Sequence, residues 1–366
     1  MPSPNPIQHE MNSQEILSRR LHNTGLSTAP FHTAEDAVTH LGAVQAQDFA
    51  AAKWSLGLRI RNSTDAEIEQ AFNDGRIQRI HILRPTWHFV MPEEIRWMTD
   101  LTAPRVRSIL AGSNRRIGLD DAVFAKTGPA IARALEGRNY LTRQELKAVL
   151  ADIGIGTDVQ RLSHILMQAE LDGLICSGPR RGKQFTYALL DERVRKSARI
   201  NREQALETLA LRYFTSHGPA QLKDFSWWSG LSGEDARAAL DRIESGLEKA
   251  TVKGKTFWFS PTSGIIPDPP PARLLSIYDE YTISYRDRSD ISESRDIERM
   301  IARGNALTAV IVIDGKVAGT WRKTTKKDSV EIRVSPFRKL DTDQQEAVEA
   351  EVARYGKFVG MPAVVV

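Results

Sequence analysis

Two carboxamide side chains, Gln45 and Gln47, stand two residues apart between two amphipathic segments, residues 33–43 and 49–58. On one continuous helix this spacing would place them on opposite faces, whereas in a short extended link they point the same way. Two carboxamides that face one spot can hold a water molecule and present carbonyl oxygens to a developing positive charge. Gln45 and Gln47 are therefore a candidate catalytic pair; the plainer interpretation is that they are polar loop residues at helix ends.

Asp48 follows the pair directly and offers an alternative base, because a carboxylate accepts a proton more readily than an amide. Farther along, β-branched and aromatic residues predict a strand or hairpin over residues 80–90, with Pro85 at an edge or bulge. In an extended strand Arg84 and His88 share a face, which beside the glutamines would form a polar cleft. A single histidine is, however, more often structural than catalytic.

The elements that must position these residues follow a pattern that recurs along the chain. Helices are predicted over residues 13–21, 65–72, 92–99, 104–113 and 120–135, and a capping box at Thr142 opens the next one. Asp158 caps a further helix, and two strands follow it around a basic tip. The same order of helices and a two-stranded ribbon returns after Arg199. Helix, turn, helix and ribbon is the order of a winged helix, and its repetition strengthens the assignment.

Basic residues gather at the predicted hairpin tips. These residues are Arg180, Arg181 and Lys183 in one copy, Lys253 and Lys255 in the next, and Lys323, Lys326 and Lys327 near the C-terminus. Such side chains can neutralise phosphates and release counterions, so they are candidate DNA contacts. A charged hairpin tip can also simply be solvated, but three such tips favour a nucleic-acid partner.

A proline-rich stretch, residues 261–271, marks a domain boundary. Beyond it, strands are predicted over residues 307–313, 316–322 and 330–334, followed by a helix over residues 341–358. The Asp314-Gly315 pair predicts a type I′ hairpin between the first two strands. The fold class is therefore mainly α with β (α+β). We expect a winged-helix-like domain with the glutamine pair over residues 1–125, winged helices over 126–198 and 199–262, and a β-barrel-like domain with a closing helix over 263–366.

Composition narrows the function further. The 366-residue chain is 41% hydrophobic and 26% charged, with a net charge of +4, which fits a soluble globular protein. Cys176 is the single cysteine, so no disulfide framework or cysteine-rich zinc site can form within the chain. The eight histidines lack metal-ligand spacing, and the sequence has neither a phosphate-binding glycine loop nor a serine nucleophile elbow. No metal and no cofactor are expected.

Three stretches carry a resemblance to a known family. They are Gln45-Ala46-Gln47 with the preceding residues 41–44, the Arg-x-Thr-x-His stretch within residues 83–90, and the acidic and aromatic stretches at residues 278–281 and 285–288. In these residues and in their order, the chain resembles the bacterial winged-helix DNA glycosylase family that includes AlkZ and YcaQ. The likeness spans most of the chain.

The resemblance implies a monofunctional DNA glycosylase that excises N-alkylated purines from double-stranded DNA, and in some members unhooks interstrand cross-links. Gln45 and Gln47 would be the catalytic pair, with water attacking at the sugar. The chemistry is reasonable because a purine alkylated at N7 is already cationic and leaves without strong acid assistance. The enzyme must place a water and stabilise an oxocarbenium-like sugar, which preorganised amide dipoles can do.

Two other functions remain open from the sequence. A non-catalytic DNA-binding protein, such as a regulator or lesion sensor, would use the glutamines only to contact phosphate or water. A protein-interaction scaffold is the more distant alternative, because winged helices also bind proteins. Residues 1–11 have no apolar core of a signal peptide, and no apolar run is long enough to span a membrane. We therefore expect a cytoplasmic monomer with no membrane partner.

Overall fold

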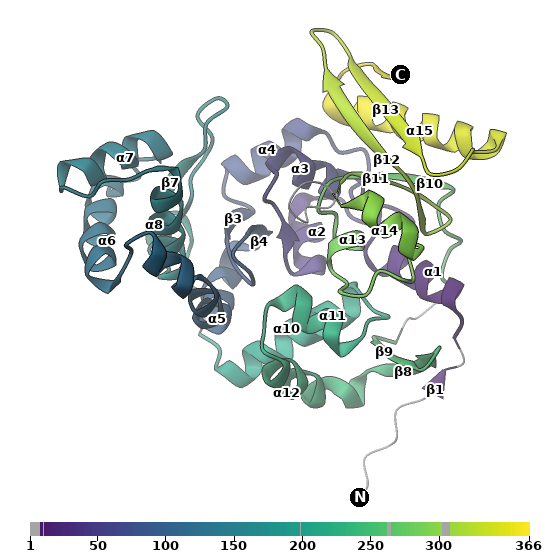
Figure 1. The fold of residues 1–366 in the computed structure, drawn as a ribbon, viewed down its shortest axis with the longest axis horizontal. Coiled ribbons are helices and arrows are strands. Elements are labelled where there is room, and N and C mark those ends of the chain that lie inside the picture. The colour runs from purple at the N-terminus through teal and green to yellow at the C-terminus, as the bar shows by residue number, and fades with distance from the viewer. Residues whose placement is uncertain (1–7, 10, 198, 262–264, 302–307) are drawn as a thin grey trace, which may run out of the picture. The chain divides into compact units, whose positions relative to one another are not determined.

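The computed structural model describes residues 8–9, 11–197, 199–261, 265–301 and 308–366 and mixes helices with short strands, which confirms the α+β fold class (Figure 1). Contacts divide the chain into two compact units. The first unit takes Met1–Glu69, Leu206–Trp228 and Gly233–Val366, and the second takes Gln70–Ala205 with Ser229–Ser232. The four-domain division at residues 125, 198 and 262 stays a prediction, and residues 262–264 of the proposed linker lie outside the described residues.

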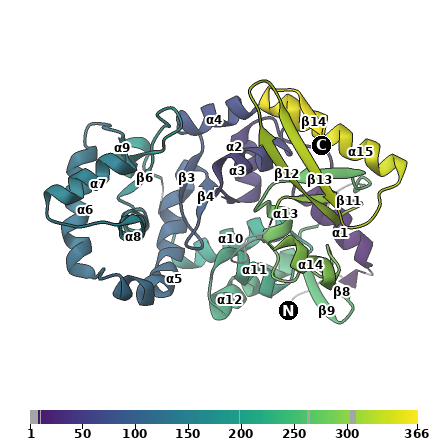
Figure 2. The ribbon, with the colours of Figure 1, turned by 45° about the horizontal axis from the view of Figure 1, so that its top comes forward.

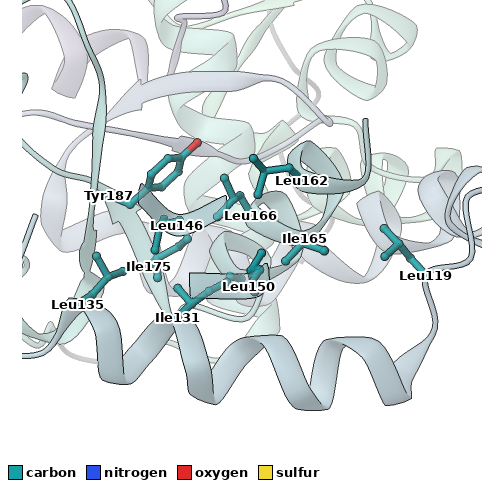
Figure 3. Close-up of a cluster of buried hydrophobic side chains, with 11 residues drawn as sticks. Leu119, Ile131, Leu135, Leu146, Leu150, Leu162, Ile165, Leu166, Ile175 and Tyr187 are labelled. Atoms are coloured by element: carbon teal, nitrogen blue, oxygen red, sulfur yellow. The ribbon is translucent and has the colours of Figure 1, made fainter. Parts of the chain in front are cut away.

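The second unit is built around one apolar core. Its helices and strands after residue 90 are η1 (Pro92–Glu94), α5 (Ile95–Arg116), α6 (Asp121–Leu135), β5 (Leu141–Thr142), α7 (Arg143–Asp152), α8 (Val159–Leu171), β6 (Ile175–Ser177), β7 (Thr186–Leu189) and α9 (Leu190–Arg193). The three strands form an antiparallel sheet in the order β5-β7-β6. Figure 3 shows side chains from α6, α7, α8 and the sheet meeting in this core, among them Ile131, Leu146, Leu166 and Tyr187.

The capping residues predicted at the starts of two helices form the expected hydrogen bonds. Thr142 forms a capping box with Glu145 at the start of α7, and the Asp158 side chain accepts the Arg161 amide at the start of α8. The predicted break between residues 99 and 104 is wrong, since α5 runs on through Pro104. Proline removes one intrahelical hydrogen bond, but buried residues on both sides of it keep this helix packed.

The stretch at residues 80–90 is a hairpin of β3 (Gln78–His81) and β4 (Trp87–Val90), in which Ile80 pairs with His88. The hairpin confirms the predicted strand or hairpin, but Arg84 lies in the turn between the strands, so Arg84 and His88 do not share the face of one extended strand. Leu83 in that turn has a φ of 62°, in the left-handed region. Gly230 packs against it, and a Cβ at position 230 would stand 2.2 Å from the Leu83 carbonyl oxygen.

The first unit begins with helices and a small sheet. Its helices and strands up to residue 260 are β1 (Gln8–His9), α1 (Ser13–Asn23), α2 (Ala34–Leu41), β2 (Val44–Gln45), α3 (Phe49–Gly57), α11 (Leu222–Ser229), α12 (Gly233–Ile243), η2 (Glu244–Gly246), β8 (Glu248–Val252) and β9 (Lys255–Phe259). The division into units falls inside α4 (Asp65–Asn73) and α10 (Arg202–Ser216), and it places Ser229, the last residue of α11, in the second unit. β8 and β9 form the predicted ribbon, and β1 adds to it in parallel. Lys253 and Gly254 turn the ribbon with positive φ angles of 50° and 73°.

The C-terminal part of the first unit is a five-stranded sheet with helices beside it. Its strands are β10 (Ala272–Leu275), β11 (Val310–Ile313), β12 (Lys316–Thr325), β13 (Val330–Pro336) and β14 (Ala363–Val365), in that order across the sheet. The short helices α13 (Glu280–Ile283) and α14 (Ser294–Met300) precede β11, and α15 (Thr342–Val359) runs alongside the long β12 and β13 (Figure 2). Asp314 and Gly315 both have positive φ, at 49° and 79°, which confirms the predicted hairpin turn.

A buried ion pair joins the N-terminal helices of the first unit to this C-terminal part. Arg59 donates to both carboxylate oxygens of Asp279, at 2.8 and 2.9 Å, and neither residue is exposed. Ser55 donates to the same carboxylate at 2.7 Å, and Arg59 also donates to the Thr24 carbonyl. A charge pair held this far from water is kept only when its remaining donors and acceptors are also satisfied, as they are here.

We expect Asp279→Ala to lower the free energy of unfolding by about 3–5 kcal/mol, because it leaves the Arg59 guanidinium buried without its counter-charge. Urea titration followed by circular dichroism measures the change. Glu293→Ala is the matched control, since the ion pair between Glu293 and Arg295 is exposed and should contribute less than about 1 kcal/mol. Equal stability of the two variants would contradict this account of the buried pair.

Candidate functional site

The segment Gln45–Asp48 links two helices, as its sequence predicts. Thr33 caps α2 with a capping box, and α2 ends at Gly42, whose φ of 79° allows the sharp turn. β2 then carries Gln45, and the Asp48 side chain caps α3 by accepting the Ala51 amide at 2.9 Å. The helices fix both ends of the link, so its few residues have little freedom.

A buried carboxylate holds the link in the middle. The Gln45 backbone N–H donates to Oε1 of Glu280 at 2.8 Å, and Glu280 is not exposed. Its other oxygen accepts the Trp228 indole N–H at 3.1 Å and the Ser284 hydroxyl at 2.5 Å, and His217 Nε2 lies 3.5 Å away. Glu280, the first residue of α13, therefore links β2 to α11 and to His217, the residue that follows α10.

The ionisation of Glu280 follows from these partners. Burial alone would raise the pKa of the Glu280 carboxyl, but the neighbouring His217 imidazole, the Ser284 hydroxyl and the Gln45 backbone N–H outweigh it and lower the pKa to about 2. Tyr213 stacks on the His217 ring at 5.0 Å between centroids, and Ser216 lies 2.8 Å from its Nδ1. The imidazole is thus oriented toward the carboxylate that it supports.

The predicted site residues differ in exposure. Gln45 is only 9% exposed, whereas Gln47 and Asp48 are exposed, so the link runs from a buried anchor to the surface. Convergence of the two amides on one water stays a prediction. Arg84 and His88 belong to the second unit, where His88 is buried with its Nδ1 3.0 Å from the Thr86 carbonyl oxygen.

Several of the predicted basic contacts already have protein partners. Arg181 donates to Glu145 at 2.7 Å and to the Tyr140 carbonyl, and Arg180 donates to the Lys183 carbonyl at 2.8 Å. The Lys183 side chain itself is exposed at the tip.

On the other ribbon, Lys255 lies 2.9 Å from Asp287 and donates to Ser289, whereas Lys253 is exposed. The hydrogen bond that Lys255 donates to the Asp287 carboxylate raises the pKa of Lys255. Lys183 and Lys253 are therefore the best placed of these residues to meet a phosphate.

Within the described part of the chain, no group of three or more His, Cys, Asp or Glu side chains is arranged to hold a metal ion. None of the helices described is long and apolar enough to cross a membrane. Burial raises the pKa of the Cys176 thiol to about 12, which makes it a poor nucleophile.

The sequence alone assigns no individual role to Glu280, the anchor of the link, or to its neighbour Asp279. The available signal was two adjacent acids between aromatic residues, Tyr278 and Tyr281, just after a proline-rich stretch. Acids in such apolar surroundings have to be paired when they are buried.

The chain is similar to known proteins along most of its length. A family model described as DNA glycosylase AlkZ-like matches residues 38–358. A Streptomyces sahachiroi protein named "Interstrand DNA cross-link repair glycosylase" is 23% identical over 370 residues, covering 95% of this chain and 96% of the relative. The solved structure of Streptomyces sahachiroi DNA glycosylase AlkZ is similar with a TM-score of 0.81 at 20% identity, over 98% of this chain and 100% of that one. The last likeness shows a shared fold.

The depressed pKa of Glu280 predicts a pH-dependent contribution to stability. Its ordinary pKa is 4.5, so ionised Glu280 stabilises the folded state above about pH 4.5, and the contribution is lost as the pH falls through about 2. Glu280→Gln should therefore cost on the order of 3 kcal/mol at pH 7 and about half of that at pH 3. Urea titrations at both pH values measure the difference in the free energy of unfolding between Glu280→Gln and the unchanged protein.

Glu349→Gln, at an exposed position on α15, serves as the control, and its free energy of unfolding should almost equal that of the unchanged protein at either pH. If the Glu280→Gln deficit stays the same or grows toward pH 3, the carboxylate is not the ionised anchor described above.

Proposed function

The chain belongs to the AlkZ-like DNA glycosylase family, and from this premise we propose that it excises N-alkylated purines from double-stranded DNA by directing water at C1′ of the damaged nucleotide. The observation that carries the proposal is the Gln45 backbone held at 2.8 Å by a buried, ionised Glu280. Electrostatic catalysis requires dipoles that are already in place when charge develops, and this anchor supplies that rigidity.

The chemistry suits amides rather than a strong acid. N7-alkylation places a positive charge on the purine, so the base is already a good leaving group. As the N-glycosyl bond breaks, positive charge develops on the sugar, and the carbonyl oxygens of Gln45 and Gln47 can stabilise it while they orient the attacking water. A rigid link limits the geometric error that would otherwise slow such a reaction.

Asp48 is the alternative base, but its position at the start of α3 favours a structural role as a helix cap. One carboxylate oxygen accepts the Ala51 amide at 2.9 Å and thereby starts α3. We therefore assign the water to Gln45 and Gln47 and keep Asp48 as the group that the experiment below must exclude.

DNA contacts are proposed on both units. The order of helices and strands over residues 126–198 and 199–262 fits two winged helices, with Lys183 and Lys253 exposed at their ribbon tips. We propose a third, more decorated copy over residues 1–125 and a barrel-like domain over residues 263–366. Arg84 and His88 are proposed to support DNA from the β3–β4 hairpin.

Interstrand cross-links are a proposed second substrate. The Streptomyces sahachiroi relative is named for their repair, and release of one cross-linked purine breaks the same N-glycosyl bond. We further propose that the enzyme acts as a monomer on nucleoid DNA in the cytoplasm, a reducing compartment in which a single buried cysteine stays reduced.

Gln45→Ala and Gln47→Ala should each slow excision of N7-methylguanine by on the order of 10²-fold or more, because each removes one preorganised dipole. Duplex affinity should hardly change, since phosphate contacts elsewhere supply it. Single-turnover release of the base from a labelled duplex measures the rate, and a mobility shift measures binding.

Asp48→Asn is the matched variant, because asparagine also caps a helix well and only the charge is lost. It should stay within a few-fold of the unchanged protein. Loss of excision in Asp48→Asn with both alanine variants active would make Asp48 the base. An unchanged protein that releases no alkylated base would leave only the DNA-binding alternative.

Lys253→Ala should weaken duplex binding without regard to sequence and reduce the slope of log K against log salt by about 0.9, the value for one phosphate contact. Lys255→Ala is the comparison, because its charge is already paired with Asp287 and should shift the slope less. Fluorescence anisotropy across a salt series gives both slopes. Equal slopes for Lys253→Ala and the unchanged protein would show that this ribbon tip does not contact DNA.

A further inference from the structure

A small cavity opens in the first unit beside Asp48, at the end of the catalytic link. Its volume is about 140 Å³, and it lies between the start of α3, the residues that follow β10, strand β12 and helix α15. Nothing in the chemistry described so far uses this space. Its walls combine aromatic rings with a few polar groups, which is the usual make-up of a ligand site.

The floor of the cavity is aromatic and rigid. Trp54, Trp321 and Tyr355 line it, and all three are at most 4% exposed. Tyr355 meets Trp54 edge-on at 4.9 Å and Trp321 at 5.5 Å between centroids. The two indole N–H groups donate to backbone carbonyls of β10, at 2.7 and 2.8 Å. With their polar atoms satisfied, the rings present only apolar surface to whatever enters.

A buried hydroxyl in the wall needs a partner. Ser276 is 3% exposed and lines the cavity, and its Oγ has no hydrogen-bond partner among the residues that the structure describes. A buried polar atom of this kind costs free energy unless something bonds to it. A purely apolar occupant would leave it unsatisfied, whereas a ligand with acceptors on its edge would not.

Charged groups stand at the rim. Asp48, Arg322 and Lys323 are exposed there, and Lys323 donates to the Tyr355 hydroxyl at 2.6 Å. The two cations suit the phosphates of a nucleic acid strand. The Asp48 carboxylate suits a base that carries a positive charge, as an N-alkylated purine does.

We propose that this cavity receives a ring of a nucleobase displaced from the DNA duplex. A closed apolar cavity of roughly 150 Å³ holds one benzene ring, so a volume of about 140 Å³ accepts one ring of a base. Bases stack on aromatic side chains, and their edges carry the acceptors that Ser276 lacks. The inference rests on the proposed function, because a displaced base requires DNA to be bound at the adjoining link.

Photo-crosslinking tests the site without any chemistry at the N-glycosyl bond. The full-length protein is bound to a duplex that carries 5-iodouracil in a mismatch, irradiated, and digested for mass spectrometry. Crosslinks are expected on peptides that contain Trp54, Trp321 or Tyr355. Ala309→Leu and Ala51→Leu, which fill the cavity from two different elements, should each reduce that yield by on the order of tenfold.

Ala353→Leu is the control, because Ala353 is exposed on the same helix as Tyr355 and should crosslink like the unchanged protein. Two filling variants guard against misfolding of either one, and circular dichroism checks both. Crosslinks found only elsewhere, or filling variants that crosslink as well as the unchanged protein, would overturn the inference.

A parallel excision assay on N7-methylguanine separates the two proposals. Excision without crosslinks in the cavity means that the enzyme does not use this site, which overturns the inference and leaves the proposed function standing. Crosslinks in the cavity without excision from any alkylated duplex support the site and overturn the proposed catalysis.

Discussion

Two adjacent buried carboxylates, Asp279 and Glu280, hold the first unit together. Asp279 accepts two hydrogen bonds from the Arg59 guanidinium. Glu280 accepts hydrogen bonds from the Gln45 backbone N–H, the Trp228 indole N–H and the Ser284 hydroxyl. Buried charges are costly unless they are fully paired, so the segments that pair with them cannot move independently. These two adjacent residues beyond the proline-rich stretch thus fix the segments before and after α3, the helix that follows the Gln45–Asp48 link.

This constraint connects stability to the proposed chemistry. A glycosylase that relies on amide dipoles instead of a metal or a strong acid gains only from dipoles held in place before the bond breaks. Glu280 holds Gln45 through the backbone N–H, while Gly42 and Asp48 fix the ends of the link. The aromatic cavity beside Asp48 adds a rigid surface built from α3, β12 and α15, in which two indole N–H groups donate to carbonyls of β10.

Local signals made much of this fold predictable. The capping residues Thr142 and Asp158 and the Asp314-Gly315 turn depend only on near neighbours in sequence, and all three predictions are confirmed. The helix break expected before Pro104 does not occur, because tertiary packing outweighs one lost hydrogen bond. Arg84 lies in a turn because Leu83, in the left-handed region, reverses the chain. The anchor could not be found this way: Gln45 and Glu280 are 235 residues apart, and no local pattern relates them. The roles of Gln45, Gln47 and Asp48 stay predictions.

A double-mutant cycle tests most directly whether Glu280 acts by positioning the Gln45–Asp48 link. Excision rates on N7-methylguanine DNA are compared for the unchanged protein, Glu280→Gln, Gln45→Ala and the double variant. If Glu280 works by positioning Gln45, its loss matters little once the Gln45 amide is gone, and the coupling energy should be about 1 kcal/mol or more. If the two rate factors simply multiply, Glu280 acts independently of the link, and the central claim is contradicted.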